Sequence, residues 1–287
     1  NNIWDAGGMD SMTNAPYLSK NNRDGARIGH VKVYDHMFLD GLEDAYNEGR
    51  LMGSFAEDCA RNYQFTRIQQ DEYAIRSLEN ALNAQKNSFF EHEITPVKVK
   101  NKNKEEILIT EDQQPKRSNA LKIPKLKPAF LSDGTVTAAN SSSISDGAAA
   151  LLISSEKYAQ RKNLKIKARI KGYAGHAHDP GWFTTAPIPA TNKLLESLNW
   201  SADEVDLWEV NEAFAVVPMA FMKELKIPRE KINVNGGACS LGHPIGASGA
   251  RILVSLINSL SLRGLKKGVA AICIGGGEAL AIAIEVD

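Results

Sequence analysis

The sequence predicts an α/β fold with helices on both faces of a buried sheet, and three features of its last third support this prediction. Two short apolar runs, 269–274 and 279–286, flank a glycine turn, and their continuous hydrophobicity is typical of strands covered on both faces. A helical pattern occupies 247–260. Farther upstream, a strand-like run at 205–210 leads into a helical pattern at 212–225. Strand followed by helix, more than once, indicates an α/β architecture.

The two helical patterns have different internal signals. Their apolar faces consist of Leu253, Leu256, Ile257 and Leu260 in the first and of Phe214, Val217, Phe221 and Leu225 in the second. Gly264 follows the first pattern and predicts its end. Pro218 lies within the second pattern and is expected to bend that helix.

The first half of the chain is organised differently. A short helix is expected at 37–46, and a longer helix should begin after Thr66, whose hydroxyl and Gln69 form the pattern of a capping box. The expected apolar stripe of the longer helix consists of Ile68, Ile75, Leu78 and Leu82. Alternating apolar and polar residues at 94–100 and 106–110, around a polar turn, predict a hairpin exposed to solvent.

Two groups of basic residues require an interpretation. The hairpin carries Lys98, Lys100, Lys102 and Lys104, but acidic neighbours at 105, 106 and 111 indicate a solvated face. The second group consists of Lys116, Arg117, Lys122, Lys125 and Lys127. A solvated loop is the favoured reading of the second group, and contact with a phosphorylated ligand is the alternative.

Composition excludes several functional classes. The 287 residues contain 34 basic and 34 acidic side chains, so the charge expected of a nucleic-acid or anionic-membrane partner is missing. The three cysteines show no spacing for a disulfide framework or a metal site, which suits a reducing compartment. His176 and His178 lack a supporting ligand cluster, so we expect an exposed loop and no metal there. The cytoplasm is the expected location, with the mitochondrial matrix as the alternative.

Three segments have the composition of reactive sites. Asn211 follows an apolar strand, the usual place for ligand groups in α/β sheets, although a helix cap is the simpler reading of its position. The loop 235–249 contains five glycines that leave His243 exposed between Gly242 and a proline. At 273–277, Cys273 precedes three glycines whose backbone N–H groups could hold an oxyanion. The sequence contains neither a dinucleotide-binding nor a P-loop fingerprint.

In these segments the chain resembles the thiolase family, and within it the acetyl-CoA acetyltransferases. The matching segments run nearly end to end and are residues 6–12, 52–57, 127–130, 134–138, 145–150, 211–215, 233–251 and 273–277. The last two correspond to the C-terminal signatures of the family and are long enough to make a chance match negligible.

The resemblance implies a five-layered fold of two similar α/β halves with an inserted loop domain that binds coenzyme A. Residues 1–14 and 144–165 would then belong to an incomplete N-terminal half, 15–143 to the loop domain and 166–287 to the C-terminal half. It also implies a homodimer or homotetramer, and acetyl-CoA, acetoacetyl-CoA and CoA as substrates and products without a separate cofactor. Acetoacetyl-CoA, ketone-body or fatty-acid metabolism would be the setting.

The resemblance also implies residue roles. His243 matches the histidine that activates the nucleophilic cysteine, Asn211 the residue that holds a water in the oxyanion hole, and Cys273 the cysteine that takes the α-proton. Gly275 matches a backbone donor of a second oxyanion hole. Contacts with the substrate would come from Ser142, Phe130, Met52 and Phe183.

One departure from the family pattern concerns the nucleophile. The family's acyl-carrying cysteine belongs to a segment that would precede Asn1, and none of Cys59, Cys239 and Cys273 matches it. We therefore expect that this chain alone has no thiolase turnover and that a cysteine-bearing N-terminal segment restores it. A non-catalytic CoA-binding or interaction module derived from a thiolase is the alternative function. The related ketoacyl synthases are the alternative enzyme class, but Cys273 in its glycine-rich segment favours thiolase.

Smaller departures concern the acyl group. Leu51 stands where many short-chain thiolases have a histidine, and Ser143 replaces a common glycine. Bulky Trp182 and Phe183 favour a short acyl pocket.

Overall fold

A central four-stranded sheet organises the computed structural model, which describes residues 3–20, 22–100 and 103–287. Its strand order is β7 (Arg169–Ala177), β10 (Glu278–Glu285), β9 (Lys267–Ile274) and β8 (Leu207–Val210). Strand β8 runs parallel to β9, whereas β10 is antiparallel to both of its neighbours. The two strands predicted around the glycine turn are therefore confirmed as β9 and β10, joined as a hairpin.

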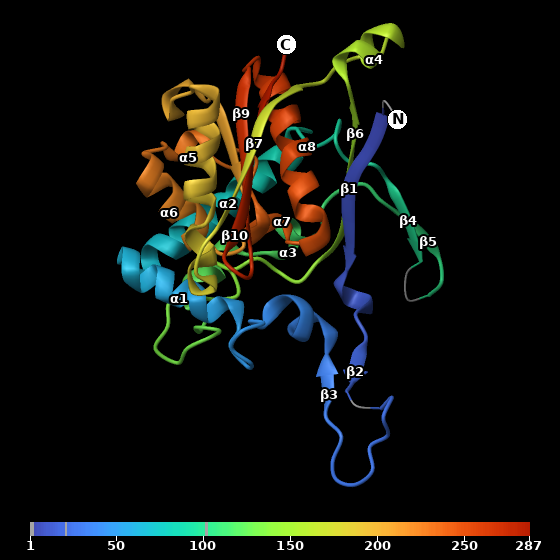
Figure 1. The fold of residues 1–287 in the computed structure, drawn as a ribbon, viewed down its shortest axis with the longest axis vertical. Helices are drawn as coiled ribbons and strands as arrows, with labels where there is room; N and C mark the ends of the chain where they lie inside the picture. Colours follow the sequence, from blue (N-terminus) through green and yellow to red (C-terminus); the bar gives the residue numbers. More distant parts are fainter. Residues whose placement is uncertain (1–2, 21, 101–102) are drawn as a thin grey trace.

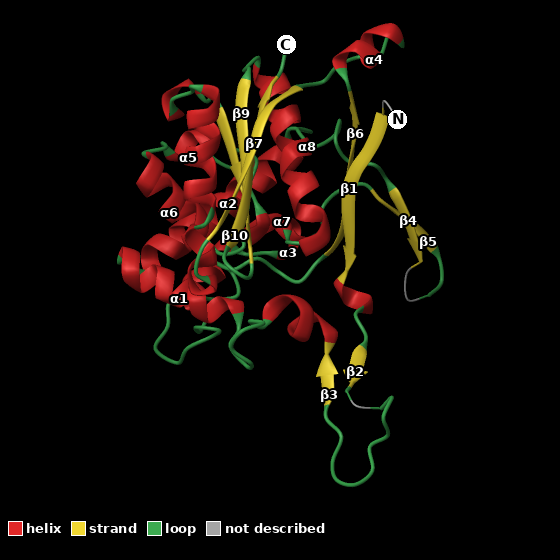
Figure 2. Ribbon diagram, viewed as in Figure 1, coloured by secondary structure: helices red, strands yellow, loops and turns green. Residues whose placement is uncertain are grey.

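Both faces of this sheet are buried, as expected. Val269, Ala271 and Cys273 of β9 belong to a large apolar cluster shared with α5 (Pro187–Leu198) and α6 (Val216–Leu225). The alternate residue Ala270 belongs to a second cluster under α8 (Ile245–Arg263). Figure 2 shows α5 and α6 on one side of the strands and α8 on the other.

A two-stranded ribbon forms a further layer beyond α8 (Figure 1). Strand β1 (Ile3–Ser11) pairs with β6 (Asp146–Ser154) in antiparallel register, from Ile3 opposite Ser154 to Ser11 opposite Asp146. A Cβ atom on Gly8 would overlap the carbonyl oxygen of Gly246, so glycine permits this close approach of β1 to the start of α8. Helix α8 is long and apolar enough to span a membrane by composition, but here it packs between the ribbon and the central sheet.

The segment between β1 and β6 forms two helices and several short elements. The longer elements are α1 (Met52–Tyr63), α2 (Arg67–Lys86), the hairpin of β4 (Val97–Lys100) and β5 (Glu106–Ile109), and the hairpin of β2 (Tyr17–Ser19) and β3 (Val33–Asp35). The shorter helices of the chain include α3 (Gln114–Arg117), α4 (Glu156–Arg161) and α7 (Ala238–Leu241). The predicted exposed hairpin and the Thr66 capping box are confirmed, while Lys102 of the hairpin turn lies outside the described residues.

Three predictions about helices were wrong in whole or in part. The helix expected at 37–46 is a single π-helical turn, Phe38–Leu42. Helix α6 begins at Val216, so Pro218 lies in its first turn, where the missing N–H costs no hydrogen bond and no bend is needed.

The third prediction, the apolar stripe of α2, is confirmed at Leu78, which is 3% exposed, but wrong at Ile68 and Leu82. Ile68 is 69% exposed and Leu82 is 37% exposed. The buried face of α2 instead carries small residues such as Ser77 and Ala81, because the loop at Gly236 lies directly against that part of the helix. A large side chain would not fit there, and the sequence pattern of α2 alone does not contain this neighbour.

Candidate active site

Asn211 and Cys273 lie at the carboxyl ends of the adjacent parallel strands β8 and β9. The backbone N–H of Asn211 donates to the carbonyl of Ala271 at 3.0 Å and extends the ladder, so Cys273 lies two residues beyond its partner. Both side chains are buried, Asn211 completely and Cys273 to 7% exposure. The end of parallel strands is the common location of reactive groups in α/β sheets.

His243 approaches Asn211 from the loop that leads into α8. Gly242 has a φ of 98°, a conformation that favours glycine, and Pro244 precedes the first residue of the helix. These constraints place His243 Nε2 at 3.2 Å from Asn211 Nδ2. Two of the residues that the sequence predicts for the site are therefore in direct contact.

Ser248, one turn into α8, fixes the tautomer of His243. Its hydroxyl donates to the carbonyl of Pro244 at 2.9 Å and lies 2.6 Å from His243 Nδ1. Because the single hydroxyl proton is used on Pro244, Nδ1–H of His243 is the donor to Ser248. Nε2 then has a free lone pair and accepts from the Asn211 amide. Asn211 Oδ1, in contrast, is buried without a hydrogen-bond partner among the described residues, which leaves an acceptor for a small polar ligand or water.

The imidazole is held neutral. Burial and, to a smaller extent, the Arg251 guanidinium lower the pKa of His243 to about 4, against the opposing effect of the Asp10 carboxylate. A neutral imidazole with a free Nε2 can accept a proton at physiological pH.

Cys273 is a protonated thiol in the resting site, because burial raises its pKa to about 12. It precedes a turn in which Gly276 and Gly277 have φ values of 105° and 93°. A Cβ on Gly277 would lie 2.2 Å from the carbonyl oxygen of His178, so the turn requires glycine at that position. The thiol is thereby followed by backbone N–H groups without side chains.

The residues expected to contact the substrate lie around the same apolar cluster. Cys273 and Phe183 are buried members, and Met52 and Phe130 pack against it from the loop segment. Met52 Sδ lies 3.2 Å from the position of a Cβ on Gly275, which brings the first turn of α1 to the glycine turn.

The fourth expected contact, Ser142, is held through its backbone. Its N–H donates to the carbonyl of Ala213 at 2.9 Å, and the carbonyl of the next residue, Ser143, accepts from the N–H of His243 at 3.3 Å. The segment 141–143 therefore joins residues 213–214, which follow β8, to the loop that carries His243. Phe130 is placed nearby by an edge-to-face contact with Phe214, whose ring centroid is 6.0 Å away.

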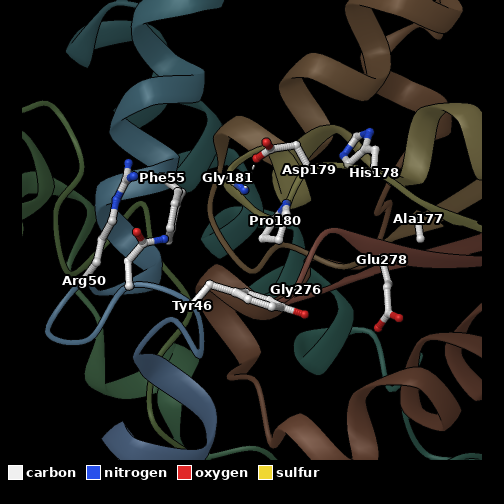
Figure 3. A pocket seen from close by; sticks show the side chains of 11 residues that line it. Tyr46, Arg50, Phe55, Ala177, His178, Asp179, Pro180, Gly181, Gly276 and Glu278 are labelled. Atoms are coloured by element: carbon white, nitrogen blue, oxygen red, sulfur yellow. Dashed lines mark hydrogen bonds between the residues drawn. The ribbon is translucent and has the colours of Figure 1, made fainter.

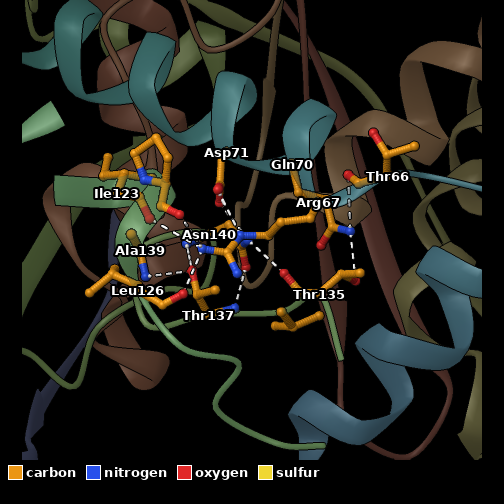
Figure 4. Close-up of polar contacts among 12 residues, drawn as sticks. Thr66, Arg67, Gln70, Asp71, Ile123, Leu126, Thr135, Thr137, Ala139 and Asn140 are labelled. Atoms are coloured by element: carbon orange, nitrogen blue, oxygen red, sulfur yellow. Dashed lines mark hydrogen bonds and ion pairs between the residues drawn. The ribbon is translucent and has the colours of Figure 1, made fainter. Parts of the chain in front are cut away.

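Polar contacts with α2 hold the loop that carries Phe130 and Ser142 (Figure 4). Arg67 pairs with Asp71 at 2.7 Å and donates to the carbonyl of Leu126, also at 2.7 Å. Asp71 in turn accepts from the Asn140 amide at 3.1 Å. Both ends of the loop 126–140 are thus fixed to one helix.

A cavity of about 620 Å³ lies on the other side of the glycine turn (Figure 3). It is lined by Tyr46, Asn47, Arg50, Phe55, 177–181, Gly276 and Glu278. His176 and His178 are half-buried, with ring centroids 5.1 Å apart, and His178 Nε2 lies 2.7 Å from the carbonyl of Trp182. Among residues 3–20, 22–100 and 103–287, no group of three or more His, Cys, Asp or Glu side chains is arranged to hold a metal.

Sequence reasoning did not identify three groups that support this site. Ser248 orients His243, and Glu209 and Arg251 form a buried pair behind it. Glu212 accepts hydrogen bonds that join α2 to the loop before His243. The sequence does contain a signal for two of these groups, because Glu209 and Glu212 are acidic residues at the end of an otherwise apolar strand. A carboxylate that is buried in such a place must have a partner.

Comparisons with known proteins agree with this arrangement. Residues 2–157 match the thiolase N-terminal domain, and residues 164–286 match the thiolase C-terminal domain. A probable acetyl-CoA acetyltransferase from Dictyostelium discoideum is 48% identical over 280 residues, which is 98% of this chain and 67% of that protein. The Bacillus anthracis acetyl-CoA acetyltransferase structure has a TM-score of 0.94 at 42% identity, and a thiolase from Ascaris suum in complex with coenzyme A has 0.92 at 43%. Each of the two alignments covers 100% of this chain and 72% of the structure. The chain belongs to the thiolase family.

Proposed function

We propose that the chain carries the acyltransferase chemistry of an acetyl-CoA acetyltransferase. The reaction joins two acetyl-CoA molecules to acetoacetyl-CoA and CoA, or cleaves a 3-ketoacyl-CoA in the reverse direction. The relatives named acetyl-CoA acetyltransferase support this substrate class, and the Ascaris thiolase in complex with coenzyme A supports CoA as the group recognised.

The observation that carries the proposal is the contact between His243 Nε2 and Asn211 Nδ2 at 3.2 Å. Once Nε2 of His243 has accepted a proton, its N–H can donate to a thioester oxygen, and a water held by Asn211 Oδ1 can donate to the same oxygen. Such stabilisation acts where negative charge develops during acyl transfer.

Cys273 is proposed to exchange the α-proton of acetyl-CoA. The thiol first releases its proton to solvent, and the resulting thiolate removes a proton from the methyl group. The electron pair of the broken C–H bond forms an enolate, whose oxygen accepts from the backbone N–H of Gly275. The resting thiol, with its pKa of about 12, is the form that returns the proton.

The acyl-carrying thiol is proposed to lie outside these three cysteines. Cys59 is buried, and burial raises its pKa to about 11. Cys239 is buried against Glu212, and burial and that carboxyl group raise its pKa. A neutral, enclosed thiol is a poor nucleophile. We therefore propose that the 287-residue chain alone does not turn over acetoacetyl-CoA and that a cysteine-bearing N-terminal segment of a relative, added to it, restores turnover.

Ser142, Phe130, Met52 and Phe183 are proposed to line the path of the pantetheine and the acyl group. Phe183 is enclosed against Phe55, with ring centroids 6.1 Å apart, and this packing supports a short acyl chain. A homodimer or homotetramer is the proposed assembly.

The test separates proton exchange from acyl transfer. The chain is incubated with acetyl-CoA in D₂O, and loss of the methyl proton signal is followed by NMR. We expect exchange by the native chain, its loss in Cys273→Ser, and retention in the control Cys59→Ser. Binding of CoA without exchange would favour a non-catalytic CoA-binding module. Cleavage of acetoacetyl-CoA by the native chain alone would overturn the proposal about the acyl-carrying thiol.

A further inference from the structure

A buried pair of charged residues, Glu209 and Arg251, lies directly behind the contact between His243 and Asn211. We propose that Arg251, anchored by Glu209, is a positioning residue that aligns α8 with β8 and so holds His243 facing Asn211. The inference rests on the proposed function only because it assumes that His243 takes part in the reaction.

The first observation is the placement of both partners on their elements. Glu209 and Asn211 are two residues apart at the end of β8, so their side chains point to the same face of the strand. Trp208 and Val210 point to the other face and belong to the apolar cluster under α5 and α6. Glu209 and Asn211 therefore both face α8.

The helix presents a matching pair. Ser248 and Arg251 are three residues apart on α8 and share one side of the helix. Ser248 binds the imidazole of His243 at 2.6 Å, and Arg251 Nη1 lies 3.7 Å from Glu209 Oε2. Arg251 thus contacts Glu209 of β8 directly, and Ser248, one helical turn earlier, is connected to Asn211 through His243.

The burial of the pair indicates a role in alignment. The side chain of Glu209 is 2% exposed and that of Arg251 is 21% exposed. In the part of the chain that the structure describes, neither Glu209 Oε2 nor Arg251 Nη1 has a hydrogen-bond partner. Burying a charge pair of this kind contributes little net stability, but a shift of either element would leave a charged group uncompensated. The pair therefore raises the free energy of other alignments of α8 and β8.

The charge of Arg251 also acts on His243. It is one of the groups that lower the pKa of the imidazole, together with burial, whereas Asp10 on β1 acts in the opposite direction. Burial raises the pKa of Glu209, and the Arg251 guanidinium opposes that rise and favours the carboxylate form.

Three further charged groups face the pair. Glu93 and Asp112 come from the loop segment before β6, and Arg251 lowers the pKa of both, against the larger effect of burial. Arg263, three turns farther along α8, acts on Glu209 but is not among the groups that shift the pKa of His243. Arg263 is therefore a matched control on the same helix.

NMR of ¹⁵N-histidine-labelled full chain tests the inference without any need for turnover. We expect Arg251→Met to raise the pKa of His243 and to replace its single Nδ1–H tautomer by a mixture. Arg251→Lys keeps the charge, and Arg263→Met leaves the pair in place, so both should retain the native pKa and tautomer. Glu209→Gln keeps the shape but removes the anchor, and should give the tautomer mixture even if Arg251→Met does not fold.

Two results would overturn the inference. One is a folded Arg251→Met or Glu209→Gln protein with the native His243 tautomer and pKa. The other is an equal change in Arg251→Lys, because the charge would then not be the cause. If acetyl-CoA shows no proton exchange but the histidine titrations behave as expected, the proposed function fails and the positioning role stands.

Discussion

Replacing Glu212 with glutamine should destabilise the protein by about 2 kcal/mol, through one unpaired buried donor. The fully buried Glu212 accepts from Tyr73 Oη and Asn233 Nδ2 on Oε1, both at 2.9 Å, and from Ser77 Oγ at 2.7 Å and the Cys239 N–H at 3.1 Å on Oε2. Glutamine should place its amide NH₂ at the Oε2 position.

The expected loss of about 2 kcal/mol depends on which of the four donors to Glu212 can form another hydrogen bond in the variant. The Ser77 hydroxyl lies 3.0 Å from Ser240 Oγ, so it can turn and accept from the new amide. The backbone N–H of Cys239 cannot turn and remains unpaired. One buried donor without a partner costs about 1–3 kcal/mol.

Thermal unfolding of the full chain measures this effect. For a chain of this size, we expect Glu212→Gln to lower the melting temperature by about 5 °C. Glu230→Gln is the control, because Glu230 is exposed and the same chemical change should have almost no effect there. Equal melting temperatures for the two variants would refute the argument that the donors of Glu212 are locked.

Three further predictions concern a cap, a titration and a turn. Thr66→Ala removes the capping box with Gln69 and should cost about 1 kcal/mol in chemical denaturation, whereas no loss would show that the box does not stabilise α2. The pKa of His243 is about 4 in the folded chain, against 6.5 for a free histidine. Between these pH values the unfolded chain therefore binds more protons than the folded chain. The free energy of unfolding should therefore fall by about 3 kcal/mol on acidification through that window, and the fall should be smaller in His243→Gln. Gly277→Ala should lower the melting temperature and abolish proton exchange, because its Cβ would overlap the carbonyl of His178.

The parts of the fold that follow from local pattern were predictable from sequence. The strands β9 and β10 are apolar on both faces, and Thr66 satisfies the first N–H groups of α2 without help from distant residues. The buried face of α2 was not predictable, because it depends on the loop at Gly236, far away in the chain. Where a helix packs closely against another backbone, its buried residues are small, such as alanine and serine. A prediction that looks for large apolar residues in the sequence then assigns the wrong residues to the buried face.

The reactive residues were also easier to find than their supports. His243 between glycine and proline, and Cys273 before three glycines, are unusual combinations that point to exposed chemistry. Arg251 and Ser248 are ordinary residues on a helix pattern, and their role appears only when α8 is placed against β8. Glu209 did carry a signal, because an acidic residue in an otherwise apolar strand must have a partner if it is buried.

The directions of successive side chains at the end of β8 explain why the residues that support the site come from several elements. Its last residues alternate in direction: Glu209 faces α8, Val210 packs into the apolar cluster, and Asn211 returns to the α8 side beside His243. The next residue, Glu212, accepts from side chains of α2 instead. A single chain segment therefore contacts the apolar core, helix α8 with the His243 loop before it, and helix α2. Because the residues on either side of Asn211 are bound to different layers, its amide is held in place at the end of the strand, while Ser248 orients the imidazole of His243 that meets it.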